Sequence, residues 1–226
     1  MRYKIFPFVM VAFVVVLLLS NTVAVKVAIF GPFFFDGAVI LFPFSYIFGD
    51  ILTEVYGYRR SRVVIWTGFI ACIFMSFIYW LVGMLPAAPS WGGQEAYQRI
   101  LGQIPRIVTA SLVAFFCGEF TNSYILAKLK IFTKGRWLWT RTIGSTIAGQ
   151  LVDTALFITI AFTGIVPETV LIRMIITNYL FKTTYEALAT PLTYAVTGWL
   201  KRVENEDYYD YKTNFNPFMV TGEDLK

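Results

Sequence analysis

The sequence predicts an all-α integral membrane protein with six transmembrane helices and both termini in the cytoplasm. Three observations support this prediction. Of the 226 residues, 57% are hydrophobic and 15% are charged, whereas soluble domains carry about 25% charged residues. Six segments have roughly the 20 apolar residues that a helix needs to cross a hydrocarbon core of about 30 Å. Basic residues fall on alternate loops, as the positive-inside rule requires.

The expected helices cover residues 6–25, 33–57, 63–85, 107–128, 140–164 and 170–200, so residues 1–200 form one transmembrane domain. Residues 201–226 form a cytoplasmic tail, which either is poorly ordered or packs under the bundle. The apolar run of the first segment is too long for the apolar part of a cleaved signal peptide, so we expect this segment to be retained as a helix.

The loops set the orientation of the bundle. Basic clusters lie before the first helix, between the second and third, between the fourth and fifth, and after the sixth. The opposite loops hold only Lys26, Arg99, Arg106 and Arg173. The positive-inside rule therefore places both termini of this multi-pass protein in the cytoplasm.

The second helix contains the stretch PFSYIFGDILTEVYG, which is unusually polar for a membrane segment. Asp50 and Glu54 are four residues apart and share one helix face. A charged group in hydrocarbon costs at least ~2.5 kcal/mol, so it is rare there and usually functional. Pro43 is expected to kink or break this helix and to expose backbone groups, as in many transporters. We expect this face to line a polar cavity.

The third helix has no ionisable residue and is expected to be a scaffold that faces lipid. In the long loop after it, residues 94–104 could form a short interfacial helix or partly cover an outer mouth. Cys72 and Cys117 lie in apolar segments and are interpreted as packing residues. The chain has no histidine, so proton coupling would have to use carboxylates or lysine.

The fourth and fifth helices each carry a pair of polar residues three positions apart. The pairs are Glu119 with Asn122, and Gln150 with Asp153. Residues at this spacing share a helix face, and the second pair is expected near the bilayer centre. Gly149 belongs to a run of small residues that favours close helix packing.

The sixth helix carries Asn178, Lys182 and Glu186 at four-residue steps along one face. Lys182 is too deep to reach either surface easily, so it should pair with an acid, either Glu186 or Asp153. Pro191 is expected to supply a second kink.

Several motifs in this order resemble the queuosine precursor transporter family, also called the vitamin uptake transporter family. They are PFSYIFGDILTEVYGYRRSRVVIWTGF, NSYILAKLK, RTIGSTIAGQLVDT and the spaced lysine, glutamate and proline of the sixth helix. The resemblance implies a bacterial importer of 7-deazaguanine bases, which are precursors of the modified tRNA nucleoside queuosine. It also implies a homodimer and a fold similar to the substrate-binding subunits of energy-coupling-factor transporters.

The chemistry of a guanine-like base suits the polar residues of the predicted helices. A carboxylate accepts two adjacent N–H donors of the base, and Asn122 or Gln150 can meet the base carbonyl and ring nitrogens. An aromatic face stacks on a base for roughly 1–3 kcal/mol. The excess of acid would suit an aminomethyl cation, or proton coupling through a carboxylate. The predicted substrate-binding residues are Phe44, Tyr46, Asp50, Glu54, Glu119, Asn122, Gln150, Asp153, Asn178, Lys182 and Glu186.

Three other interpretations stay open. The chain could be a substrate-binding subunit that needs a separate ATP-driven complex, because it has no GxxxxGK[ST] loop of its own. It could be an intramembrane enzyme in which Asp50 and Asp153 form an aspartyl dyad. It could also be a scaffold whose polar residues serve packing alone. The leading prediction is a transporter with no catalytic residue, metal or cofactor, whose partners are a 7-cyano- or 7-aminomethyl-7-deazaguanine base, the bilayer and a second copy, with no nucleic acid.

Overall fold

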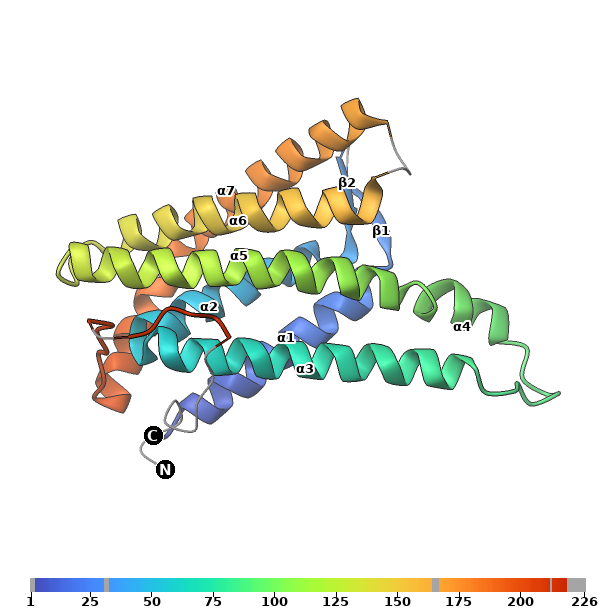
Figure 1. Ribbon diagram of the computed structural model, residues 1–226, viewed down its shortest axis with the longest axis horizontal. Coiled ribbons are helices and arrows are strands. Elements are labelled where there is room, and N and C mark those ends of the chain that lie inside the picture. Colours follow the sequence, from blue (N-terminus) through green and yellow to red (C-terminus); the bar gives the residue numbers. More distant parts are fainter. Residues whose placement is uncertain (1–2, 31–32, 164–166, 212, 219–226) are drawn as a thin grey trace.

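The computed structural model describes residues 3–30, 33–163, 167–211 and 213–218, and the start of α1 and the end of α7 lie at the same end of a helical bundle (Figure 1). The elements are α1 (Phe6–Val23), β1 (Val27–Phe30), β2 (Phe33–Asp36), the 3₁₀ helix η1 (Gly37–Ile40), α2 (Phe42–Tyr56), α3 (Tyr58–Gly83), α4 (Gln94–Leu101), α5 (Ile104–Phe132), α6 (Leu138–Phe162) and α7 (Glu168–Glu204). In Figure 1, α3, α5 and α6 run lengthwise, and α1 and α7 cross them obliquely.

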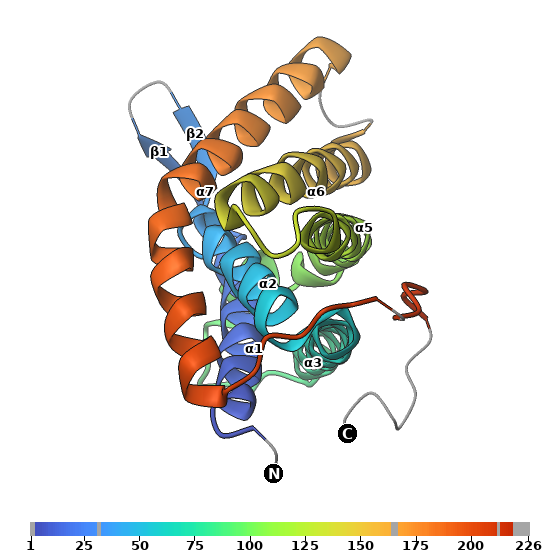
Figure 2. The same ribbon diagram turned by 90° about the vertical axis from the view of Figure 1, so that its left-hand side faces the viewer.

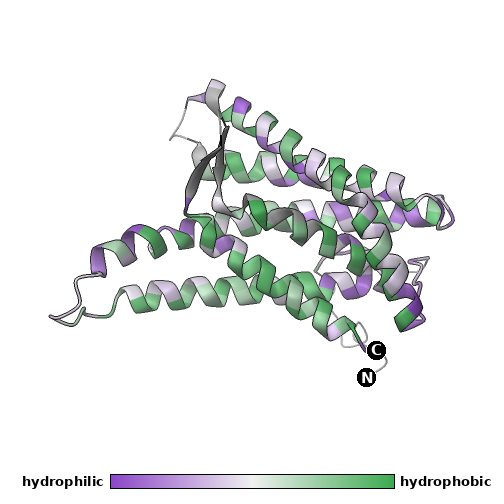
Figure 3. Ribbon diagram, turned by 180° about the vertical axis from the view of Figure 1, so that it is seen from behind, coloured by the Kyte–Doolittle hydropathy of each residue, from purple (hydrophilic) through white to green (hydrophobic). Residues whose placement is uncertain are grey.

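Four helical stretches in the described part of the chain are long and apolar enough to cross a membrane. They are α1, α3, the stretch Gln94–Phe132 that contains α4 and α5, and Leu138–Ala161 within α6. Figure 3 shows hydrophobic residues along these helices and hydrophilic ones in α4 and around the end where α1 begins and α7 ends. The chain therefore has the character of a membrane protein. Six spans stay a prediction, because α2 has only 15 residues and α7 mixes polar with apolar residues. The orientation of the termini also stays a prediction.

The prediction of a single helix over residues 33–57 is wrong in its first part. Val27–Phe30 and Phe33–Asp36 form an antiparallel hairpin in which Val27 pairs with Asp36, so the fold is helical with one short two-stranded sheet. Branched and aromatic side chains favour a pleated strand over a helix. Residues 31–32, predicted to form a turn, lie outside the described residues.

The sequence suggested that Pro43 would kink or break the second helix, but Pro43 does not interrupt α2. It lies in the first turn of α2, where a helix has no carbonyl to offer to a backbone N–H, so the missing donor of proline costs nothing. The helix that carries Asp50 and Glu54 is therefore short and begins at Phe42. Pro191 lies inside α7, and Figure 2 shows α7 changing direction along its length.

Helices α5 and α6 approach each other at glycine. A Cβ atom on Gly118 would lie 2.6 Å from the Cβ of Asp153, and one on Gly149 would lie 2.8 Å from the Cβ of Asn122 and 3.0 Å from the Gly118 carbonyl oxygen. Only glycine permits this approach. The predicted small-residue contact on the fifth helix is thus confirmed, and it brings Asn122 and Asp153 to one helix interface.

The tail packs against the bundle, which is the second of the two alternatives. Helix α7 runs to Glu204 rather than ending at residue 200. The Tyr58 amide donates to Asp210 Oδ2 at 3.1 Å, and the Trp66 indole donates to the Pro217 carbonyl at 2.8 Å. Gly57 has a φ of 86°, and the Tyr208 ring covers it so closely that a Cβ there would collide with the ring. Figure 2 shows the tail passing beside α2 and α3.

Candidate functional site

Asp50 of α2 and Asn122 of α5 form a hydrogen-bonded pair in the middle of the bundle. Both side chains are buried, and Asn122 Nδ2 donates to Asp50 Oδ1 at 2.8 Å. This bond orients the amide, so Asn122 Oδ1 is fixed as an acceptor. Within the part of the chain that the structure describes, that oxygen is buried and has no hydrogen-bond partner. The pair can therefore accept N–H donors from a ligand.

Glu119 lies beside this pair, one turn before Asn122 on α5. Its carboxylate occupies the space next to the Gly49 backbone of α2, and Ser123 Oγ donates to Glu119 Oε1 at 3.4 Å. A chain of hydroxyls continues from there, because Thr53 Oγ1 lies 3.2 Å from Ser123 Oγ and 3.0 Å from Ser61 Oγ of α3. All of these groups are buried, so the polar interior extends across three helices.

Asp153 of α6 binds Lys182 of α7. The Lys182 ammonium lies 2.9 Å from Asp153 Oδ2, and both side chains are largely buried. Of the two acids predicted to pair with Lys182, Asp153 is therefore confirmed. Gln150 is buried one turn earlier on α6. Together Asp50, Glu119, Asn122, Gln150, Asp153 and Lys182 form what we call the central cluster, carried by α2, α5, α6 and α7.

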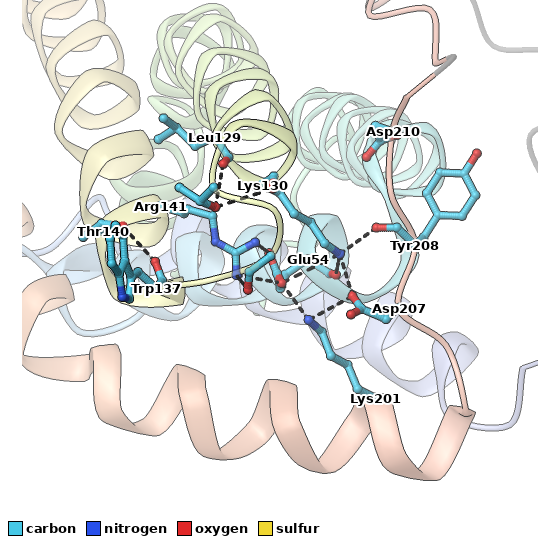
Figure 4. A network of polar contacts seen from close by, with 12 residues as sticks. Glu54, Leu129, Lys130, Trp137, Thr140, Arg141, Lys201, Asp207, Tyr208 and Asp210 are labelled. Atoms are coloured by element: carbon cyan, nitrogen blue, oxygen red, sulfur yellow. Dashed lines mark hydrogen bonds and ion pairs between the residues drawn. The ribbon is translucent and has the colours of Figure 1, made fainter.

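Glu54 belongs to a second group, which we call the Glu54 network (Figure 4). Its buried carboxylate is paired with Arg141 of α6 at 3.1 Å, with Lys201 of α7 at 2.7 Å and with Lys130 of α5 at 3.7 Å. Asp207 of the tail completes the network, at 2.7 Å from Lys130 and 2.9 Å from Lys201. With three cations on it, Glu54 is better placed to hold helices together than to bind a neutral base.

The pKa of Asp207 lies below its ordinary value. Partial burial would raise the pKa of this carboxyl, but the hydrogen bonds and charges of Lys130 and Lys201 outweigh that effect. Asp207 is therefore ionised at neutral pH and holds both lysines.

A polar face of α6 joins the two groups. Its buried members are Arg141, Thr142, Ser145, Thr146, Gln150 and Asp153. They extend over thirteen residues, or about 18 Å along the helix axis. Polar side chains avoid hydrocarbon unless they are paired or line a pathway, so this face is a candidate for a polar pathway, and we call it the α6 route.

Four of the predicted site residues are not brought to the central cluster by any described contact. Asn178 is half-buried and donates to the Met174 carbonyl of its own helix at 3.0 Å. Phe44 has 39% of its surface exposed, and its offset of six positions from Asp50 places it on another face of α2. The side chains of Tyr46 and Glu186 lie outside the described residues.

Sequence reasoning missed the roles of Lys130, Arg141 and Lys201. It assigned Lys130 and Lys201 to basic segments outside the helices, and Arg141 only to the start of the helix at 140–164. Lys130 and Arg141 are both buried. Helix α5 extends to Phe132, one turn beyond its predicted end at residue 128, and so includes Lys130. A signal was present, since both residues follow the apolar period of their helices into the last and first turns. Thr53 and Ser123 gave no signal that separates them from ordinary packing hydroxyls.

Comparisons with known proteins place the chain in a family. A family model described as "Putative vitamin uptake transporter" matches residues 36–196. A protein of Bacillus subtilis (strain 168) named "Probable queuosine precursor transporter" is 33% identical over 159 residues, which cover 70% of this chain and 68% of that protein. The "Queuosine precursor transporter" of Escherichia coli (strain K12) is 28% identical over 162 residues, which cover 71% and 70%. No solved structure matches.

Proposed function

This chain belongs to the vitamin uptake transporter family, and from that premise we propose that it imports a queuosine precursor through the polar interior of its bundle. The substrate would be a 7-deazaguanine base, as the names of its relatives suggest. The membrane would be the bacterial inner membrane, with both termini in the cytoplasm, and the functional unit a homodimer.

The observation that carries this proposal is the acceptor pair at Asp50 and Asn122. A guanine-like base presents an N–H and an adjacent amino group along one edge. Asp50 offers a carboxylate, and Asn122 offers the amide oxygen that its bond to Asp50 holds in place. The sequence had suggested that Asn122 meets the base carbonyl as a donor. One of the two Nδ2 hydrogens is used on Asp50, whereas Asn122 Oδ1 has no partner among the described residues. Its role in this proposal is therefore to accept a hydrogen from the base.

The rest of the central cluster supports a polar ligand that crosses the bundle. Glu119, Gln150 and the Asp153–Lys182 pair lie on the helices that flank Asp50 and Asn122. All six side chains of the cluster are buried or nearly so, so the base reaches them only when the helices separate. Alternating separation at the two ends of a bundle is the general mode of secondary transporters.

The intramembrane enzyme is not favoured by these contacts. An aspartyl dyad shares one proton between two neighbouring carboxyl groups. Asp50 instead accepts a hydrogen from Asn122, and Asp153 is paired with the ammonium of Lys182. Both carboxylates have nitrogen donors as partners, which suits binding rather than hydrolysis.

The test is uptake of labelled 7-cyano- and 7-aminomethyl-7-deazaguanine by cells that cannot make them, that express this chain, and that lack any energy-coupling complex. Each base is measured with and without a proton uncoupler. Accumulation that collapses with the uncoupler supports a self-sufficient, proton-coupled transporter, and accumulation that survives it supports facilitated entry followed by metabolic trapping. Absence of uptake, with the protein present in the membrane, would overturn the proposal in favour of a subunit that needs a coupling complex, or of another ligand.

A further inference from the structure

The α6 route ends beneath the tail. It runs from Asp153 in the central cluster to Arg141 in the Glu54 network. On α7, Thr190, Thr193, Thr197 and Lys201 recur at helical spacing, and the three threonines are buried. Thr142 and Thr197 each keep a buried hydroxyl without a hydrogen-bond partner among the described residues. Leaving such a group unpaired is unfavourable, and this cost is recovered when water or a polar solute enters.

One carboxylate closes this end of the route. Glu54 of α2 is paired with Lys130 of α5, Arg141 of α6 and Lys201 of α7, so four helices meet at a single side chain (Figure 4). The α6 and α7 helices cannot move away from α2 here unless Arg141 and Lys201 leave Glu54. Breaking one partner from a buried pair is costly, so the helices are held together while the network is complete.

Lys130 links the tail to Glu54. Its ammonium donates to the Glu54 carbonyl at 2.7 Å, to Asp207 Oδ1 at 2.7 Å and to the Tyr208 carbonyl at 2.6 Å. An ammonium has three N–H donors, and all three are used. The Tyr208 amide returns a bond to the Val55 carbonyl at 3.2 Å, so the tail is paired to the end of α2 from both sides.

The next part of the tail continues along α3 and α5. Arg62 donates to the carbonyls of Asn214 at 3.0 Å and Asn216 at 2.6 Å. The Phe215 ring packs against Tyr58 and Tyr124, with centroids 4.9 and 5.1 Å apart. We call residues 207–211 and 213–218 the strap. The strap lies beyond residues 36–196, the stretch that the family model matches.

We propose that the strap is the gate at this end of the transport route, and that Lys130 is the latch that holds it closed. This inference rests on the proposed function, because a gate needs a route that carries a solute. The structure has the closed form. Opening releases Asp207 and Tyr208 from Lys130, which frees Lys201 and allows α6 and α7 to part from Glu54. Asp50 lies one turn from Glu54 on α2, so a base bound at Asp50 acts on the helix that carries the network.

The first test measures access to the route without any substrate. In a chain with Cys72→Ala and Cys117→Ala, a single cysteine is introduced by Thr197→Cys, one turn before Lys201 on α7. A membrane-impermeant thiol reagent is applied from the side of the tail, with and without Lys130→Met. We expect little labelling with Lys130 present and extensive labelling with Lys130→Met.

Native Cys72 is the matched control, because it is buried in α3 away from the α6 route. With Cys117→Ala alone, we expect Cys72 to stay unlabelled both with and without Lys130→Met. If Thr197→Cys stays unreactive in the Lys130→Met variant, the strap does not gate the route. If Cys72 becomes equally reactive, Lys130 holds the fold and not a gate, which also overturns the proposal.

The second test fixes the strap to α5. Tyr124→Cys and Phe215→Cys, in the same cysteine-free chain, are joined by oxidation. We expect the oxidised protein to bind the base, seen as a rise in its melting temperature, and to lose uptake until a reductant is added. If the oxidised protein takes up the base as fast as the protein treated with reductant, the gate is overturned while the proposed function stays intact. A pair at Thr22→Cys and Met75→Cys, whose native side chains lie 3.5 Å apart on α1 and α3, controls for oxidation itself.

Discussion

Asp50 and Glu54 lie one turn apart on α2, yet their carboxylates belong to different networks. Asp50 accepts a hydrogen bond from the neutral amide of Asn122, whereas Glu54 is paired with three cations. The two acids look alike in the sequence. Their partners give Asp50 the chemistry of a ligand-binding group and Glu54 that of a structural junction.

Asp50→Asn should abolish uptake of the base while leaving the protein in the membrane. The substitution keeps the shape of the side chain but replaces one acceptor with a donor, so the edge of the base loses its charged partner. The measurement is initial uptake, normalised to protein in the membrane fraction. Glu95→Gln is the control, because Glu95 is 79% exposed and lies in a surface pair with Arg99, worth about 0.3–0.5 kcal/mol. Equal uptake by both variants would contradict the assignment of Asp50.

Lys182→Met should destabilise the protein by about 3–5 kcal/mol, because it leaves the Asp153 carboxylate buried without its cation. The double variant Asp153→Asn/Lys182→Met should recover much of this loss, since neither charge is then buried alone. Unfolding midpoints in detergent measure both effects. A double variant that is no more stable than Lys182→Met would show that the ion pair is not what Lys182 contributes.

Gly149→Leu should prevent accumulation of folded protein. Even a Cβ at this position would lie 2.8 Å from the Cβ of Asn122, so the larger side chain forces α5 and α6 apart. Gly198→Leu on α7 is the matched control, because nothing lies within 4 Å of a Cβ there. Membrane yield and gel filtration compare the two. Normal accumulation of the Gly149→Leu variant would show that the helix contact tolerates a side chain.

Acidification should act on the strap in two opposite steps. Burial raises the pKa of Asp210 above its ordinary value, despite hydrogen bonds from Thr213 and the Tyr58 amide that lower it. Protonation in mild acid therefore favours the docked strap, and this gain is lost as the pH rises through the raised pKa of Asp210. The pKa of Asp207 is lowered, so its contribution is complete above the ordinary aspartate pKa of about 3.9 and is lost as the pH falls through its lower folded value.

The pH response can be followed with a spin label on Tyr211→Cys, in the chain with Cys72→Ala and Cys117→Ala. The Tyr211 side chain is 69% exposed, so the label should not disturb docking. Label mobility should fall slightly in mild acid and rise in stronger acid. Asp210→Asn should remove the first change and Asp207→Asn the second. A single monotonic rise in mobility in the Tyr211→Cys protein would contradict opposite roles for the two carboxyls.

The sequence predicted much of the helical framework. The helices at residues 58–83, 104–132, 138–162 and 168–204 lie within a few residues of their predicted ends, because long apolar runs and helical spacing are local properties. It also predicted that α6 packs closely through small residues, and that Lys182 pairs with Glu186 or Asp153. It was wrong about residues 33–41, where the same apolar character suits a strand as well as a helix.

What the sequence by itself determined was therefore a membrane protein of apolar helices with polar residues at set positions, and its resemblance to a transporter family. The tertiary structure decided which polar groups meet. Asp50 with Asn122, Asp153 with Lys182, and Glu54 with Lys130, Arg141 and Lys201 join residues far apart in the chain. A carboxylate in the sequence can bind a substrate or a cation equally well. Only the nearest donor in the folded bundle decides between them, since the energy of a buried charge depends on the distance to its partner.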